Sequence, residues 1–188
     1  PNETTEVDAT NAFTAPTYAS SGINGYPAVT FIDWENRRMD TATFNAAPSY
    51  TSGVSLVAVV DPSFWYQDVP ILGGGTTYIG ANTSYWNIWA GGSPLGASSS
   101  STNPTFLVAK FDGGTGADRL WVDGTSKINA NAGSHQMTFA NIGAVSGASY
   151  SFYGKIAFYG IYEGDITADG SYAALKSWVT SHYGITVA

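Results

Sequence analysis

Residues 119–128 read R-L-W-V-D-G-T-S-K-I, which is two runs of strand-forming residues separated by Asp123-Gly124. Asp-Gly readily adopts the positive φ angles of a two-residue turn, and the twist of that turn matches the flanking strands. The stretch therefore predicts a β-hairpin. Residues 54–60 read V-S-L-V-A-V-V, with apolar side chains on both faces of an extended chain. This pattern is typical of a central strand that is covered on both sides.

Further short runs of this kind occupy most of the chain. They are rich in β-branched and aromatic residues, and Gly, Asn, Ser and Pro separate them, as expected for strands and turns. The expected strands are residues 26–32, 38–43, 69–72, 76–81, 86–90, 105–111, 137–142 and 152–162. Near the C-terminus Tyr172, Leu175, Val179 and Tyr183 follow at helical spacing before Gly184. The sequence thus predicts an all-β protein, a two-sheet antiparallel β-sandwich, with one short C-terminal helix against an edge or end.

Composition limits the classes of partner. The chain has 188 residues, with 7 basic and 14 acidic side chains and a net charge of −7, so no nucleic-acid partner is expected. The longest apolar run, residues 56–60, is far shorter than the roughly 20 residues that span a bilayer, so no membrane insertion is expected. The length fits a single domain, residues 1–188, whose polar first part, residues 1–21, can be extended.

Four stretches occur in an order that characterises one known superfamily. They are I-N-G-Y-P-A-V-T-F at residues 23–31, F-L-V-A-K-F-D-G-G at 106–114, R-L-W-V-D-G-T at 119–125, and Y-G-K-I-A-F-Y-G-I-Y at 153–162. With the helix that closes in Y-G-I, they resemble the concanavalin A-like lectin/glucanase superfamily, specifically its laminin-G-like domains. The resemblance implies a jelly roll of the type found in bacterial surface proteins, secreted carbohydrate-active proteins and bacteriophage structural proteins. The fold carries many activities, so it does not define one.

The residue patterns of the superfamily's enzymes are incomplete in this chain. Glycoside hydrolysis needs two carboxyl groups, which the laminarinase-like members carry as E-x-D-x-x-E. The nearest match begins at Glu163 and has Ala168 where the third acid is required. The alginate-lyase-like members use a Gln-x-His pair, whereas His135 and Gln136 are adjacent here. We therefore expect no enzymatic activity and no catalytic residues.

Acidic residues near turns raise the question of a metal. Asp112, Asp118 and Asp123 are close in sequence, and Ca²⁺ prefers carboxylate and carbonyl oxygens. Their spacing matches no EF-hand, however, and Asp112 and Asp123 each precede glycine, as turn residues commonly do. No cofactor or metal is expected, and Ca²⁺ is the less favoured alternative.

Aromatic residues between the expected strands suggest a carbohydrate site. A flat Trp or Tyr ring can stack on the apolar face of a sugar while neighbouring Asp and Asn side chains orient the hydroxyls. The candidate carbohydrate-binding residues are Asp61, Trp65, Tyr66, Asp68, Trp86, Asn87 and Trp89. Strand alternation places Trp86 and Trp89 on opposite faces, and packing in the core is the competing interpretation for both rings.

These observations favour a non-enzymatic recognition or structural module. The preferred interpretation is a bacteriophage virion protein (a capsid decoration, fibre or adhesion protein) that binds a glycan or other virion or surface subunits. The absence of cysteine fits synthesis without disulfides. The alternative is a secreted carbohydrate-binding module of a larger bacterial surface protein or polysaccharide-degrading enzyme. The expected location is the virion surface or extracellular.

Overall fold

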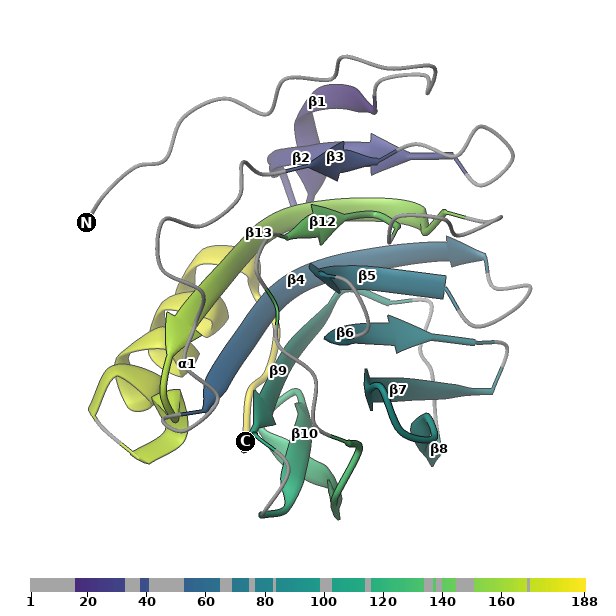
Figure 1. Cartoon of the computed structure of the whole chain (residues 1–188). Coiled ribbons are helices and arrows are strands. Elements are labelled where there is room, and N and C mark those ends of the chain that lie inside the picture. The colour runs from purple at the N-terminus through teal and green to yellow at the C-terminus, as the bar shows by residue number, and fades with distance from the viewer. Residues whose placement is uncertain are drawn as a thin grey trace.

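The computed structural model describes most of the chain (Figure 1). The described residues are 16–32, 38–40, 53–64, 69–74, 77–82, 84–98, 103–113, 116–133, 137, 140–144, 151–168 and 170–188. They form two antiparallel sheets and a C-terminal helix, which confirms the predicted β-sandwich.

The larger sheet has seven strands in the order β1-β2-β13-β4-β9-β10-β11. Their bounds are β1 Thr17–Ile23, β2 Tyr26–Phe31, β13 Tyr153–Glu163, β4 Val54–Phe64, β9 Thr105–Phe111, β10 Asp118–Val122 and β11 Thr125–Ala130. The smaller sheet has six strands in the order β3-β12-β5-β6-β7-β8. Their bounds are β3 Met39–Asp40, β12 Asn141–Ile142, β5 Val69–Gly74, β6 Thr77–Ala81, β7 Tyr85–Ala90 and β8 Leu95–Ser98.

The central strand β4 is covered on both faces, as its sequence predicts. Val54, Leu56, Ala58 and Val60 point into the core between the two sheets. The alternate residues Val57 and Val59 belong to a second apolar cluster on the outer side of the seven-stranded sheet. All of these side chains are fully buried.

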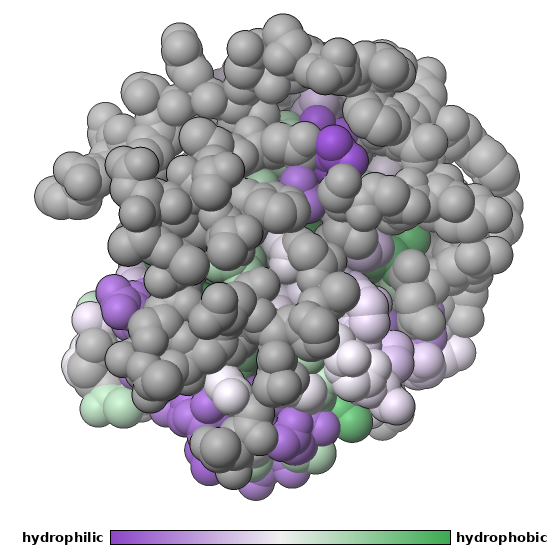
Figure 2. All heavy atoms as spheres, viewed as in Figure 1, coloured by the Kyte–Doolittle hydropathy of each residue, from purple (hydrophilic) through white to green (hydrophobic). Residues whose placement is uncertain are grey.

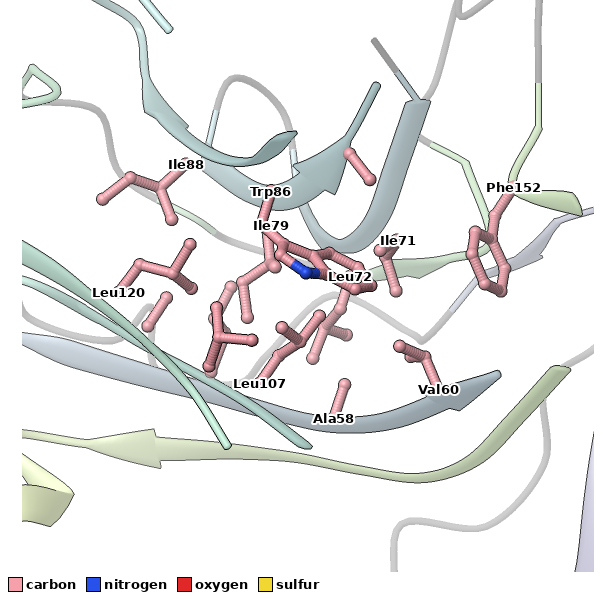
Figure 3. Close-up of a cluster of buried hydrophobic side chains, with 14 of the residues drawn as sticks. Ala58, Val60, Ile71, Leu72, Ile79, Trp86, Ile88, Leu107, Leu120 and Phe152 are labelled. Atoms are coloured by element: carbon pink, nitrogen blue, oxygen red, sulfur yellow. The ribbon is translucent and has the colours of Figure 1, made fainter. Parts of the chain in front are cut away.

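Trp86 lies at the centre of the core between the sheets. Its indole extends from β7 toward Leu107 and Ala58 on the opposite sheet, beside Leu72 (Figure 3). The side chain is 0% exposed. Because aromatic side chains bury the largest areas in a core, this ring contributes much of the apolar contact between the two sheets.

The helix α1 (Gly170–Tyr183) packs on the outer face of the seven-stranded sheet, where it covers the second apolar cluster. The prediction that it would lie against an edge or end is therefore wrong. It ends at Gly184, whose φ of +68° suits glycine. The side-chain amide of Asn24, in the β1–β2 turn, donates a hydrogen bond to the carbonyl of Tyr183.

The β10–β11 hairpin has the turn that Asp123-Gly124 predicts, with φ angles of +49° and +79°. The Asp123 carboxylate also accepts a hydrogen bond of 2.8 Å from the amide of Phe106 on β9. The backbone carbonyl of Asp123 accepts a hydrogen bond from the amide of Ala188. The hairpin therefore fixes the neighbouring strand and the C-terminal segment together.

Several element bounds differ from the prediction. Residues 17–21, expected in a polar leading segment, belong to the edge strand β1, and β8 was not predicted. The strand β4 continues to Phe64, beyond residue 60, where the predicted strand ends. Pairing with β13 holds this extension, since Pro62 lies opposite Gly154 at a register shift. Within the described residues, no helix is long and apolar enough to cross a membrane.

The central position of Trp86 gives a first prediction. Trp86→Ala removes a fully buried ring and leaves a cavity, so the free energy of unfolding should fall by about 3–5 kcal/mol in urea titrations. Tyr18, which is 67% exposed on β1, provides the control, because Tyr18→Ala should change it by less than about 0.5 kcal/mol. Equal effects of the two substitutions would contradict this placement of Trp86.

Candidate functional site

The outer face of the six-stranded sheet carries aromatic and amide side chains. In β7 the core residues Trp86 and Ile88 alternate with Tyr85, Asn87 and Trp89, which lie on the outer face. Pairing places Tyr78 of β6 opposite Trp89 and Gly80 opposite Asn87. We call Tyr78, Tyr85 and Trp89 the β7 platform.

The Trp89 ring is fixed at two points. Its centroid lies 5.3 Å from that of Tyr78, with an angle of 58° between the planes. Its indole N–H donates a hydrogen bond to the carbonyl of Gly92. The Trp89 ring is half-buried, whereas Tyr78 is only 6% exposed. The buried Tyr78 ring therefore packs against the more exposed Trp89 ring.

Glycines allow the platform rings to lie on the sheet. A Cβ atom on Gly96 would lie 2.5 Å from Cδ2 of Tyr85, and a Cβ atom on Gly80 would lie 3.0 Å from Cε2 of Tyr78. The first distance is too short for a real side chain and the second is tighter than most, so each ring lies close over a glycine. The half-buried Tyr85 and Trp89 thus lie on the sheet near its β8 edge. Figure 2 shows pale, weakly polar residues over β6–β8, in contrast to the purple hydrophilic residues over the β10–β11 hairpin.

Two of the predicted sugar contacts are corrected. Trp86 faces the core with 0% exposure, as the competing packing interpretation held, so its ring has no surface to offer a sugar. Asn87 does lie on the platform side, between Tyr85 and Trp89 in sequence. It is nevertheless fully buried, with its Oδ1 2.6 Å from the position of a Cβ atom on Gly80. Its amide therefore packs against the sheet and is not open to a ligand.

Asp61 is separated from the platform. It lies on β4 next to the core residue Val60, so its side chain points to the outer face of the seven-stranded sheet. There its carboxylate lies 3.6 Å from Nζ of Lys155 on β13. Asp61 and Trp89 thus lie on opposite outer faces of the sandwich, and one sugar residue cannot contact both. The other predicted residues, Trp65, Tyr66 and Asp68, lie outside the described residues.

The acids considered for Ca²⁺ accept hydrogen bonds from backbone amides. Asp118, which is 1% exposed, accepts them from Asp112 at 2.8 Å and from Ala132 at 2.6 Å. Burial raises the pKa of Asp118 above its ordinary value, and the two amides oppose this effect. Asp123 binds the Phe106 amide from a separate turn. In the part of the chain that the structure describes, no three acidic or histidine side chains come together as a metal site would require.

The acidic turn after β13 has a structural role as well. The Asp165 carboxylate accepts hydrogen bonds from the amide and hydroxyl of Thr167, at the start of the 3₁₀ helix η2 (Ile166–Ala168). Nζ of Lys110 on β9 lies 3.2 Å from it. Burial alone would raise the pKa of Asp165, but the bonds from Thr167 and Lys110 outweigh it and hold this pKa below its ordinary value.

Solved structures with the same architecture come from carbohydrate-active and toxin proteins. Domain 4 of an extracellular GH43 arabinanase from Geobacillus stearothermophilus, solved with arabinotriose, has a TM-score of 0.59 and 16% identity, over 82% of this chain and 78% of that one. The binding domain of Paraclostridial Mosquitocidal Protein 1 has a TM-score of 0.64 and 8% identity, over 92% and 47%. A Trypanosoma rangeli sialidase in complex with the inhibitor DANA has a TM-score of 0.57 and 13% identity, over 79% and 27%.

These similarities support the β-sandwich fold. This chain spans less than half the length of the toxin binding-domain chain and of the sialidase chain. No family model matches the sequence, and no curated protein matches it.

The Asp165 contacts give a prediction about acid stability. Because its pKa is lower in the folded chain, the charge of Asp165 stabilises the fold above the unfolded pKa, and this contribution is lost as the pH falls through the folded pKa. Asp165→Asn keeps an oxygen acceptor for Thr167 but removes the charge near Lys110. It should therefore lower the free energy of unfolding at about pH 7 and have a smaller effect at about pH 2–3. A difference that stayed constant in urea titrations across this range would contradict the argument.

Proposed function

We propose that this chain is a non-catalytic carbohydrate-binding domain and that the β7 platform is its sugar-binding surface. The observation that carries the proposal is the pair of half-exposed rings, Tyr85 and Trp89, on one face of β7. Trp89 is held before a ligand arrives by its contact with Tyr78 and its hydrogen bond to Gly92, and Tyr85 lies over Gly96. A preformed site loses less conformational entropy on binding.

The platform suits the apolar face of an uncharged sugar. None of its three side chains carries a carboxylate, an ammonium or a guanidinium group. The chain as a whole has a net charge of −7, which repels acidic polysaccharides at long range. We therefore infer a neutral glycan, and the arabinotriose complex of the GH43 domain suggests arabinan as the first probe.

A binding role agrees with the local environment of four of the described acidic residues. Asp118, Asp123 and Asp165 satisfy backbone amides, and Asp61 lies beside Lys155. Each of these carboxylates therefore has a structural partner. The sialidase and arabinanase activities belong to those whole proteins, and they are not carried over to this chain. We place the domain outside the cell, where its polysaccharide ligands occur.

The role as a bacteriophage virion protein, which the sequence favoured, has no counterpart among the three structures compared above. It stays a prediction. A carbohydrate-binding domain is compatible with it, since a virion protein can recognise a surface glycan.

Affinity electrophoresis tests the proposal. Native gels containing linear arabinan, xylan, laminarin or galactomannan should retard the wild-type chain in at least one case. Trp89→Ala should weaken that binding about three- to tenfold, because it removes a stacking ring. Tyr18→Ala, which removes an exposed ring outside the platform, should leave it unchanged. Unchanged retardation of folded Trp89→Ala would rule out the platform as the binding surface.

A further inference from the structure

A second row of exposed rings lies on the other outer face of the sandwich, beside α1. Trp178 and Tyr162 are each 37% exposed. Half-buried rings of Tyr26, His182 and Phe158 adjoin them. We call these five side chains the aromatic strip.

Four of the five rings contact one another in turn. The centroids of Tyr26 and His182 are 3.7 Å apart. His182 stacks on Trp178 at 5.0 Å with an interplanar angle of 17°, since the two lie one turn apart on α1. Trp178 meets the edge of Phe158 at 5.1 Å. Asn24 binds the carbonyl of Tyr183 at the helix end, and His182 packs between the rings of Tyr26 and Trp178.

Strand β13 extends the strip along the sheet. Phe158, Gly160 and Tyr162 lie opposite Val59, Val57 and Ser55 of β4. The two valines belong to the cluster under α1, so this set faces the same side as the helix. Tyr159 alternates to the opposite side.

Gly160 forms the floor between the two rings of β13. A Cβ atom there would lie 3.1 Å from Cε2 of Tyr162 and 3.7 Å from Cζ of Phe158, so both rings extend over the glycine. The strip therefore runs from the helix onto the strand without an intervening side chain.

We propose that the aromatic strip binds an extended neutral polysaccharide chain, at a site separate from the β7 platform. Trp178 and Tyr162 are its two exposed rings, and no member of the strip carries a carboxylate, an ammonium or a guanidinium group. Exposed rings at two neighbouring positions suit successive sugar residues, which present apolar faces along the chain. This proposal shares the ligand class of the proposed function but does not rest on the platform.

The exposed area argues against a protein partner. An aromatic side chain buries about 150–250 Å², so a ring that is 37% exposed offers on the order of 60–90 Å². The whole strip then offers a few hundred Å², whereas a stable protein interface buries about 800 Å² on each side. A thin ligand such as a single polysaccharide chain needs no wider surface.

The experiment uses Tyr162→Ala and Trp178→Ala in native gels containing linear arabinan, xylan, laminarin or galactomannan. Tyr162 is outside both apolar clusters, so its variant should fold even if Trp178→Ala is unstable. Each variant should weaken retardation by at least one polysaccharide about three- to tenfold. Tyr18→Ala is the matched control, as an exposed tyrosine outside the strip that should have no effect.

Comparing these variants with Trp89→Ala separates the two surfaces. If only the strip variants lose polysaccharide binding, the result supports the strip and contradicts the platform. If only Trp89→Ala loses polysaccharide binding, the result supports the platform and contradicts the strip. The strip proposal is overturned if folded Tyr162→Ala binds every polysaccharide as the parent does, or if the parent binds none. A change of sedimentation coefficient in Tyr162→Ala without a change in sugar binding would also overturn it, since the strip would then join copies of the chain.

Discussion

The structure depends on covering both faces of β4. This strand lies at the centre of the larger sheet and is apolar on each side, so one face needs the second sheet and the other needs the helix. Burial of apolar surface is the main stabilising contribution in a domain of this size. Trp86 and its aliphatic neighbours cover the inner face of β4, and Val179 and Tyr183 of α1 lie in the cluster that covers its outer face. The result is a three-layer arrangement of sheet, sheet and helix.

This arrangement determines which aromatic rings lie at the surface. In β7 the Trp86 side chain lies in the core, and strand alternation places Tyr85 and Trp89 on the outer face. On α1, Val179 and Tyr183 lie on the face that packs against the sheet, and Trp178 lies at the side of the helix, where it is partly exposed. Glycine completes both surfaces, since Gly96 and Gly160 lie beneath rings that a larger side chain would displace. Core packing therefore leaves certain aromatic rings at the surface, and these rings form the two proposed binding surfaces.

Local patterns predicted the fold well. Alternation in residues 54–60, the Asp123-Gly124 turn and the helical spacing before Gly184 are all properties of neighbouring residues, and each is confirmed. The candidate site was harder to predict from the sequence, because it depends on which strands pair. Nothing near Tyr78 indicates that it supports Trp89, which follows from the β6–β7 register. Similarly, Asp61 and Trp89 were predicted to share one site, but they lie on different sheets and point to opposite outer faces.

The placement of the two ring sets on opposite sides of the molecule has a consequence for solutions of long polymers. A single polysaccharide strand cannot wrap around the sandwich easily, so two occupied surfaces would engage different strands. Such a molecule acts as a cross-linker instead of gaining avidity along one strand. Mixed with a soluble polymer that both surfaces accept, it would raise viscosity or form a gel near a defined ratio of protein to polymer.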